Sequence, residues 1–147
     1  MRLTRFTDFS LRVLIYLGQN QQNRVTIHQI SEVYDISKNH LMKVVSNLTR
    51  LQFVVAQRGP GGGIQLNRLP EDISLCEVIS NTEKHIKQLD KYTPSDTDES
   101  TAENRLGSYL QHALQAYLDA LGRFTLADIL EPDTEAAQLL DMNEKAA

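Results

Sequence analysis

Residues 26–51 contain two short helical patterns separated by only a few residues. The first begins at a capping box, Thr26-Ile-His-Gln, and its apolar positions recur at helical spacing through Tyr34. The second has Ser37 as its expected cap, and its apolar positions are Leu41, Val44, Val45, Leu48 and Leu51. Two short helices joined by a three- to four-residue turn form the helix-turn-helix pattern, so this pair should organise the fold.

The other face of the second helix is basic and rich in amides. It has no carboxylate, and its members are Lys38, Asn39, Met42, Lys43, Ser46, Asn47 and Arg50. The first turn of a recognition helix reaches base edges in the major groove, where lysine and asparagine suit the acceptors. We therefore predict that DNA is contacted by Lys38, Asn39, His40 and Lys43. The alternative is a small helical module with a solvated face.

A glycine-rich stretch, RGPGGG at residues 58–63, lies between two β-like runs at 53–57 and 64–67. This arrangement predicts a hairpin, and a hairpin after a helix-turn-helix is a winged helix. Glycine allows the backbone to approach DNA closely, and the arginine suits a phosphate or the minor groove. The wing residues expected at DNA are Arg58, Gly59, Pro60, Gly61 and Gly62. A nucleotide-binding P-loop is disfavoured, because it needs Gly-Lys-Ser/Thr at the start of a helix.

Charge divides the chain near the end of this wing. Residues 1–68 contain nine Lys/Arg and three Asp/Glu, which gives +6, whereas residues 69–147 contain six Lys/Arg and sixteen Asp/Glu, which gives −10. Such asymmetry suggests a basic half that faces a polyanion and an acidic half that faces away. Chance clustering of charge on solvated faces is the alternative.

The whole pattern predicts a mainly α-helical fold with a small β-hairpin wing. A first helix is expected at 8–17 with Thr7 as its cap, and another near Ser74, where SLCE has the form of a capping box. The predicted organisation is a winged helix-turn-helix DNA-binding domain at 1–82 and an acidic loop at 83–104. A dimerisation helix and a short following helix should occupy 105–131, and an acidic tail 132–147.

The long helix predicted after the acidic loop has an apolar stripe. The stripe can cover its own domain or pair with a second copy of the chain. We predict a homodimer, because little of the domain is left for the stripe to cover and such DNA readers usually bind two half-sites. The expected dimerisation residues are Leu106, Leu110, Ala113, Leu114, Tyr117, Leu118 and Leu121.

Other chemistry is sparse. The one cysteine, Cys76, lies at a predicted helix N-terminus, which favours thiolate, so a redox switch competes with a simple packing role. The four histidines are scattered, and no metal site is proposed from them. No nucleophile–base set indicates an enzyme. There is no membrane-length apolar run and no signal-peptide pattern, so we expect a cytoplasmic protein.

Four segments resemble the winged-helix transcription regulators of the IscR/NsrR family, and NsrR-type proteins most closely. They are MRLTRFTDFSLRVLIYL at 1–17, ISKNHLMKVVSNL at 36–48, RGPGGGIQL at 58–66 and FTLADIL at 124–130. The resemblance implies a homodimeric regulator, mostly a repressor, on palindromic promoter sites. It also implies major-groove contacts from Lys38, Asn39, His40 and Lys43, with Arg58 and its glycines in the minor groove.

The chain departs from this family in the loop before the long helix. Sensing members hold an iron–sulfur cluster there with three cysteines, whereas the matching positions in this chain are Thr93, Asp98 and Asn104. Asp8 matches a position from which NsrR-type proteins offer a carboxylate, but it cannot hold a cluster alone. We therefore expect no cofactor. Three alternatives stay open: control by a partner protein or small molecule, oxidation of Cys76, and an interaction module that has lost DNA binding.

Overall fold

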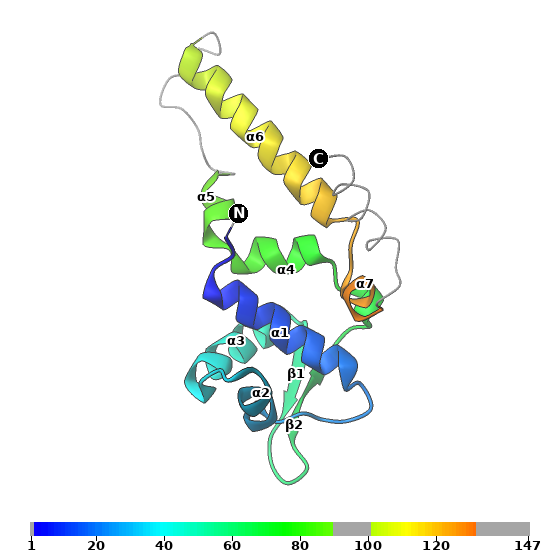
Figure 1. Cartoon of the computed structure of the whole chain (residues 1–147). Coiled ribbons are helices and arrows are strands. Elements are labelled where there is room, and N and C mark those ends of the chain that lie inside the picture. Colours follow the sequence, from blue (N-terminus) through cyan, green and yellow to red (C-terminus); the bar gives the residue numbers. More distant parts are fainter. Residues whose placement is uncertain (1, 90–100, 132–147) are drawn as a thin grey trace.

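A computed structural model of the chain describes residues 2–89 and 101–131 (Figure 1). Its elements in chain order are α1 (Arg5–Gln19), α2 (Ile27–Tyr34), α3 (Lys38–Arg50), β1 (Val54–Gln57), β2 (Gly63–Leu66), the 3₁₀ turn η1 (Pro70–Asp72), α4 (Leu75–Thr82), α5 (Lys84–Leu89), α6 (Ala102–Leu121) and α7 (Leu126–Leu130). The mainly helical fold with one antiparallel hairpin confirms the predicted fold class.

Helix α1 is the centre of the packing. It contacts α3, α4, α7 and β2, and in Figure 1 it lies between the helix-turn-helix with its hairpin on one side and α4 on the other. Val13, Leu14 and Leu17 of its apolar stripe are fully buried, and the helix packs against α3 and β2. The largest side chains of this core are Phe53, Leu14, Leu17, Ile30, Leu41, Leu48, Ile73 and Leu126.

The helix-turn-helix forms where the sequence predicts it. Thr26 and Gln29 form the expected reciprocal capping box on α2, and Ser37 caps α3 by accepting from the His40 backbone N–H. Asp35 makes the turn in a left-handed conformation, with φ of 51°, which aspartate tolerates better than most residues. The Ser31 hydroxyl donates to the Ile36 carbonyl at 2.7 Å and holds the turn against α2.

The hairpin pairs Val54 with Leu66 and Gln57 with Gly63. At the end away from the turn, each strand is one residue shorter than predicted, since β1 begins at Val54 and β2 ends at Leu66. Two of its glycines have reasons internal to the fold. Gly61 has φ of 71°, a value that side chains rarely adopt, and a Cβ on Gly63 would lie 2.8 Å from the Val25 carbonyl oxygen. That oxygen accepts a hydrogen bond from the Ile64 backbone N–H at 2.8 Å, so Val25 forms an isolated antiparallel β-bridge with β2.

Two predicted helix caps are wrong. Helix α1 begins at Arg5 and is capped by Thr4, whose hydroxyl accepts from the backbone N–H of Thr7, so Thr7 lies inside the helix instead of capping it. Ser74 precedes α4 but makes no side-chain cap. The glutamate of its expected capping box, Glu77, instead forms a 2.8 Å ion pair with Arg68.

The region expected to be one acidic loop contains helical residues at both ends. Helix α5 lies within it, and α6 begins at Ala102, three residues before the predicted start, because Thr101 caps it through the Asn104 backbone N–H. Thr93, Asp98 and the acidic tail at 132–147 lie outside the described residues. The predicted division into domains therefore stays a prediction.

Glu83 joins the start of α1 to the junction of α4 and α5. The residue is 6% exposed, and Oε1 accepts hydrogen bonds from the Thr4 backbone N–H at 2.7 Å and the Thr4 hydroxyl at 3.1 Å. Burial raises the pKa of this carboxyl, but hydrogen bonds from Thr7 and Thr4 outweigh burial, so the net pKa lies below its ordinary value. The charged form therefore stabilises the fold.

We expect Glu83→Gln to lower the free energy of unfolding by about 1–3 kcal/mol near neutral pH, because the threonine donors lose a charged acceptor. A carboxyl with a lowered folded pKa contributes fully above its unfolded pKa, and this contribution is lost as the pH falls through the folded pKa. The gap between wild type and variant should therefore shrink below the ordinary value of 4.5. Urea unfolding at about pH 7 and about pH 3 measures both gaps. Equal gaps would show that the charge of Glu83 is not what stabilises.

Candidate nucleic-acid interface

The buried stripe of α3 fixes which of its side chains face outward. Leu41, Val44 and Leu48 are held in the core at no more than 1% exposure, so the basic, amide-rich face points away from the body. The predicted residues Lys38, Asn39, His40 and Lys43 are all exposed. Asn39 and Lys43 come together in the middle of the face, and together with Met42 and Ser46 they line a shallow hollow of about 540 Å³.

Lys38 and His40 flank this central pair. The His40 ring lies 6.0 Å from the ring of Phe9 on α1, measured between centroids, so His40 sits at the seam between the two helices. The sequence places Met42 on this face without predicting a contact for it. It is 50% exposed, and an apolar side chain at this place can contact a thymine methyl.

The wing places its basic residue at the tip of the hairpin. Arg58, Gly59, Pro60 and Gly61 are exposed at the turn of the hairpin, and the hairpin extends below α2 and α3 in Figure 1. Gly62 is partly covered, and a Cβ there would collide with the carbonyl oxygens of Gln57 and Gly59. The predicted wing residues therefore occupy one accessible tip, and Gly62 supports its inner side.

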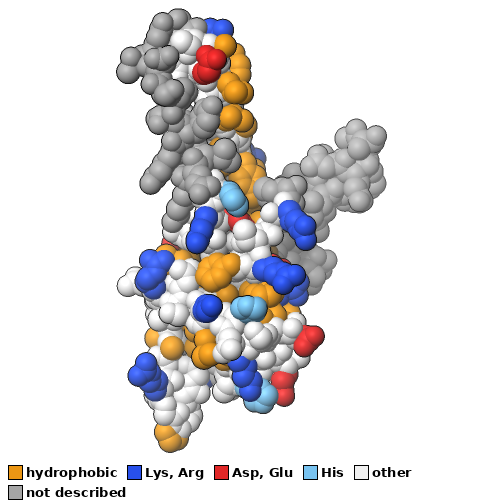
Figure 2. All heavy atoms as spheres, turned by 90° about the vertical axis from the view of Figure 1, so that its left-hand side faces the viewer, with side chains coloured by type: hydrophobic (Ala, Val, Ile, Leu, Met, Phe, Trp, Pro, Cys, Tyr) orange, Lys and Arg blue, Asp and Glu red, His pale blue; other side chains and the backbone are white. Residues whose placement is uncertain are grey.

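Positive charge spreads over the face that carries α3. Figure 2 shows this face, which is the left-hand side of Figure 1, and blue Lys and Arg side chains are distributed from the wing to the base of the long helix. Red carboxylates are few on this face, and most of those visible lie at its margin or on the long helix. A surface of this kind attracts a polyanion.

Helix α6 extends away from the body (Figure 1), and Gly107 is its one buried residue in the part of the chain that the structure describes. The predicted stripe divides along its length. Leu106, Leu110 and Ala113 are exposed, and Tyr109, at 69% exposure, widens this apolar surface although the sequence did not single it out. Helix α6 also contacts α4 and α5 of its own chain. The remaining predicted dimerisation residues lie in the second half of α6 and are half-buried: Leu114, Tyr117, Leu118 and Leu121.

Cys76 is half-buried in α4, with its Sγ 3.8 Å from the Ser80 hydroxyl. Within residues 2–89 and 101–131, no three His, Cys, Asp or Glu side chains are grouped as a metal site. None of the described helices is long and apolar enough to cross a membrane.

Residues 3–132 match the model of the Rrf2 family, described as iron-dependent transcriptional regulators. The protein named HTH-type transcriptional regulator NsrR from Bacillus subtilis is 40% identical over 98% of this chain and all of its own length. NsrR from Bacillus licheniformis is 41% identical over 95% of this chain and 99% of its own.

Solved structures share the fold. T. potens IscR superposes with a TM-score of 0.72 at 22% identity, covering 92% of this chain and 90% of that one. CymR, the global cysteine regulator of B. subtilis, superposes with a TM-score of 0.70 at 20% identity, covering 91% and 99%. The relatives are named as transcriptional regulators, which are not enzymes, as the sequence predicts. With its winged helix and basic recognition face, the chain belongs to the Rrf2 family of helix-turn-helix transcriptional regulators.

Proposed function

We propose that this protein is a cytoplasmic, sequence-specific repressor that binds palindromic promoter sites as a homodimer. The observation that carries the proposal is the α3 face, where Asn39 and Lys43 project together from a helix whose other side is locked in the core. Their donors fit the acceptors of adenine and guanine in the major groove. Arg58 on the wing supplies a contact to phosphate or the minor groove on one side of that groove.

Dimerisation is supported by the exposed apolar side chains of α6. A helix that exposes Leu106, Tyr109 and Leu110 to water leaves apolar area that a second copy can cover. A two-fold dimer presents two recognition helices, and the sites that such dimers bind are correspondingly palindromic. Repression follows when a dimer occupies a promoter.

Asn39→Ala is expected to cost roughly 1–3 kcal/mol on the cognate duplex and to relax base preference at one position of each half-site. Arg58→Ala is expected to weaken binding to every duplex, because phosphate contacts carry no sequence information. Fluorescence anisotropy on a selected duplex and on single-base variants measures both effects. Gln19→Ala, at the exposed end of α1, serves as the control and should bind like wild type. If Asn39→Ala and Arg58→Ala also bind like wild type, both assigned surfaces are wrong.

We further propose that the regulator works without an iron–sulfur cluster. Clusters are held mainly by thiolates, and the single cysteine lies in α4, half-buried beside Ser80. The Asp8 carboxylate is engaged with Arg12 at 2.9 Å. Anaerobic reconstitution with iron and sulfide should therefore leave the protein colourless, whereas a stable visible chromophore with stoichiometric iron would contradict this proposal.

Without a cluster, DNA binding must be regulated in another way. A small molecule or partner protein acting near the loop before α6 is the first candidate, and oxidation of Cys76 is the second. Titrating DNA binding with hydrogen peroxide separates them, because Cys76→Ser should be insensitive only if the thiol is the sensor. An interaction module that no longer binds DNA would show a flat dependence of duplex affinity on salt.

A further inference from the structure

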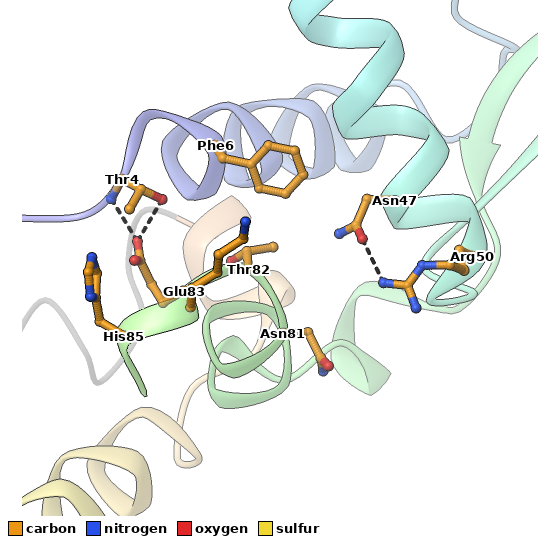
Figure 3. Close-up of a pocket in the computed structure, with 9 residues that line it drawn as sticks. Thr4, Phe6, Asn47, Arg50, Asn81, Thr82, Glu83 and His85 are labelled. Atoms are coloured by element: carbon orange, nitrogen blue, oxygen red, sulfur yellow. Dashed lines mark hydrogen bonds between the residues drawn. The ribbon is translucent and has the colours of Figure 1, made fainter. Parts of the chain in front are cut away.

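A cavity of about 620 Å³ opens between the start of α1, the end of α3 and the α4–α5 junction. Figure 3 shows Phe6 from α1 on one side, Asn47 and Arg50 from α3 on another, and Asn81, Thr82 and Glu83 across from them. These elements lie on the left of Figure 1, which is also the side that carries the basic face. The cavity therefore lies on the same side of the molecule as the candidate interface, toward the opposite end of α3 from its predicted base-reading turn.

The wall of this cavity is cationic. Its two cations are Arg50 and Lys84, and Glu83 is its one carboxylate among the described residues. The Glu83 carboxylate accepts hydrogen bonds from Thr4, and the two cations outnumber it. The wall thus favours an anion over a cation or an apolar molecule.

Hydrogen-bond donors of the recognition helix face the same cavity. Asn47 Oδ1 accepts from the Arg50 guanidinium at 2.8 Å, which orients that guanidinium. Asn47 Nδ2 is buried against the wall and has no hydrogen-bond partner among the described residues. A buried amide donor without an acceptor is destabilising, and a ligand with several acceptor oxygens could supply the missing partner. Phosphate has these oxygens, and arginine pairs with them in a bidentate geometry.

We propose that this cavity receives a backbone phosphate of the bound duplex, held by Arg50, Lys84 and the Asn47 amide. The proposal rests on the proposed DNA-binding function. The wing contacts the backbone at one border of the major groove, and this cavity contacts it at the other border. The recognition helix is then clamped between two phosphate contacts, which sets its depth and register.

The test is the salt dependence of affinity for a selected duplex. Arg50→Ala and Lys84→Ala should each reduce the logarithmic salt slope by about 0.9, and the double variant by about twice that. Preference for the selected duplex over single-base variants should be unchanged. Arg123→Ala removes an exposed cation between α6 and α7, on the other side of the molecule, and should leave the slope as in wild type. Because Arg50 also bonds Asn47, the exposed Lys84→Ala decides the test if Arg50→Ala unfolds.

Neutral methylphosphonate links, placed one at a time along the duplex, locate the contact. One neutral link, at the groove border that the wing does not contact, should weaken duplex binding by wild type but leave binding by Lys84→Ala unchanged. A second experiment distinguishes a free phosphate from a duplex phosphate as the ligand of the cavity. In it, chloride is exchanged for inorganic phosphate at constant ionic strength and duplex affinity is measured. If this competes in wild type while no link has an effect, the cavity binds a free phosphate and the duplex assignment is wrong. A steep wild-type slope that neither variant changes overturns the cavity proposal alone, whereas a flat wild-type slope overturns DNA binding itself.

Discussion

A chain carrying both Leu106→Glu and Leu110→Glu is expected to be monomeric and to bind a two-half-site duplex about 10²–10⁴-fold more weakly than wild type. The loss is large because the second recognition helix of a dimer binds intramolecularly, at a high effective concentration. Placing carboxylates in an apolar interface removes that advantage, since each charge would have to be buried without a partner. Sedimentation measures the oligomeric state, and anisotropy measures the affinity.

The same substitutions should leave each protomer folded. Leu106 is 51% exposed and Leu110 is 39% exposed, so neither contributes much to the core of its own chain. His112→Glu introduces the same charge on another exposed position of α6 and should stay dimeric, because His112 lies outside the stripe. A double variant that remains dimeric, or a monomer that keeps wild-type affinity for the palindrome, would contradict the assignment of α6.

Leu48→Ala is expected to lower the free energy of unfolding by about 2–5 kcal/mol, which is a large part of the 5–15 kcal/mol typical of a domain. Leu48 is fully buried on α3, where its side chain joins the core that the helix shares with α1 and β1. Truncation leaves a cavity that surrounding helices cannot fully close. The truncation should therefore disturb the orientation of α3 although it changes none of the residues predicted to contact DNA.

Thermal unfolding checks this, with Met42→Ala as the matched control. Met42 lies on the same helix and is 50% exposed, so its truncation should change stability by no more than about 0.5 kcal/mol. Met42→Ala is expected to act on DNA affinity instead. Similar stability losses in the two variants would mean that α3 is rotated relative to its described position.

The recognition helix and wing could be predicted from sequence because their determinants are local. Thr26 and Gln29 cap α2 within one turn, the apolar spacing of α3 fixes its buried side, and the glycines after Arg58 meet the demands of a tight turn. Each of these signals depends on residues a few positions apart. Tertiary contacts then reinforce the local preference instead of competing with it.

The failures have non-local causes. Thr4 and Thr7 are both plausible caps in the sequence, and Thr4 also hydrogen-bonds Glu83, 79 positions later in the chain. Glu77 has the position of a capping-box residue but pairs with Arg68 across the η1 segment. The cavity that we propose for a phosphate could not be predicted for the same reason, since Arg50 and Lys84 line one cavity only after α1, α3 and the α4–α5 junction have packed together.

Selection of bound duplexes from a random pool tests the central claim most directly. A homodimeric, sequence-specific reader should enrich an inverted repeat whose half-sites lie about one helical turn, or a multiple of it, apart. Affinity for that repeat should exceed affinity for a shuffled duplex by at least about 10³-fold and should fall steeply with salt. A pool that converges on no shared motif, with weak binding that salt leaves unchanged, would contradict the account.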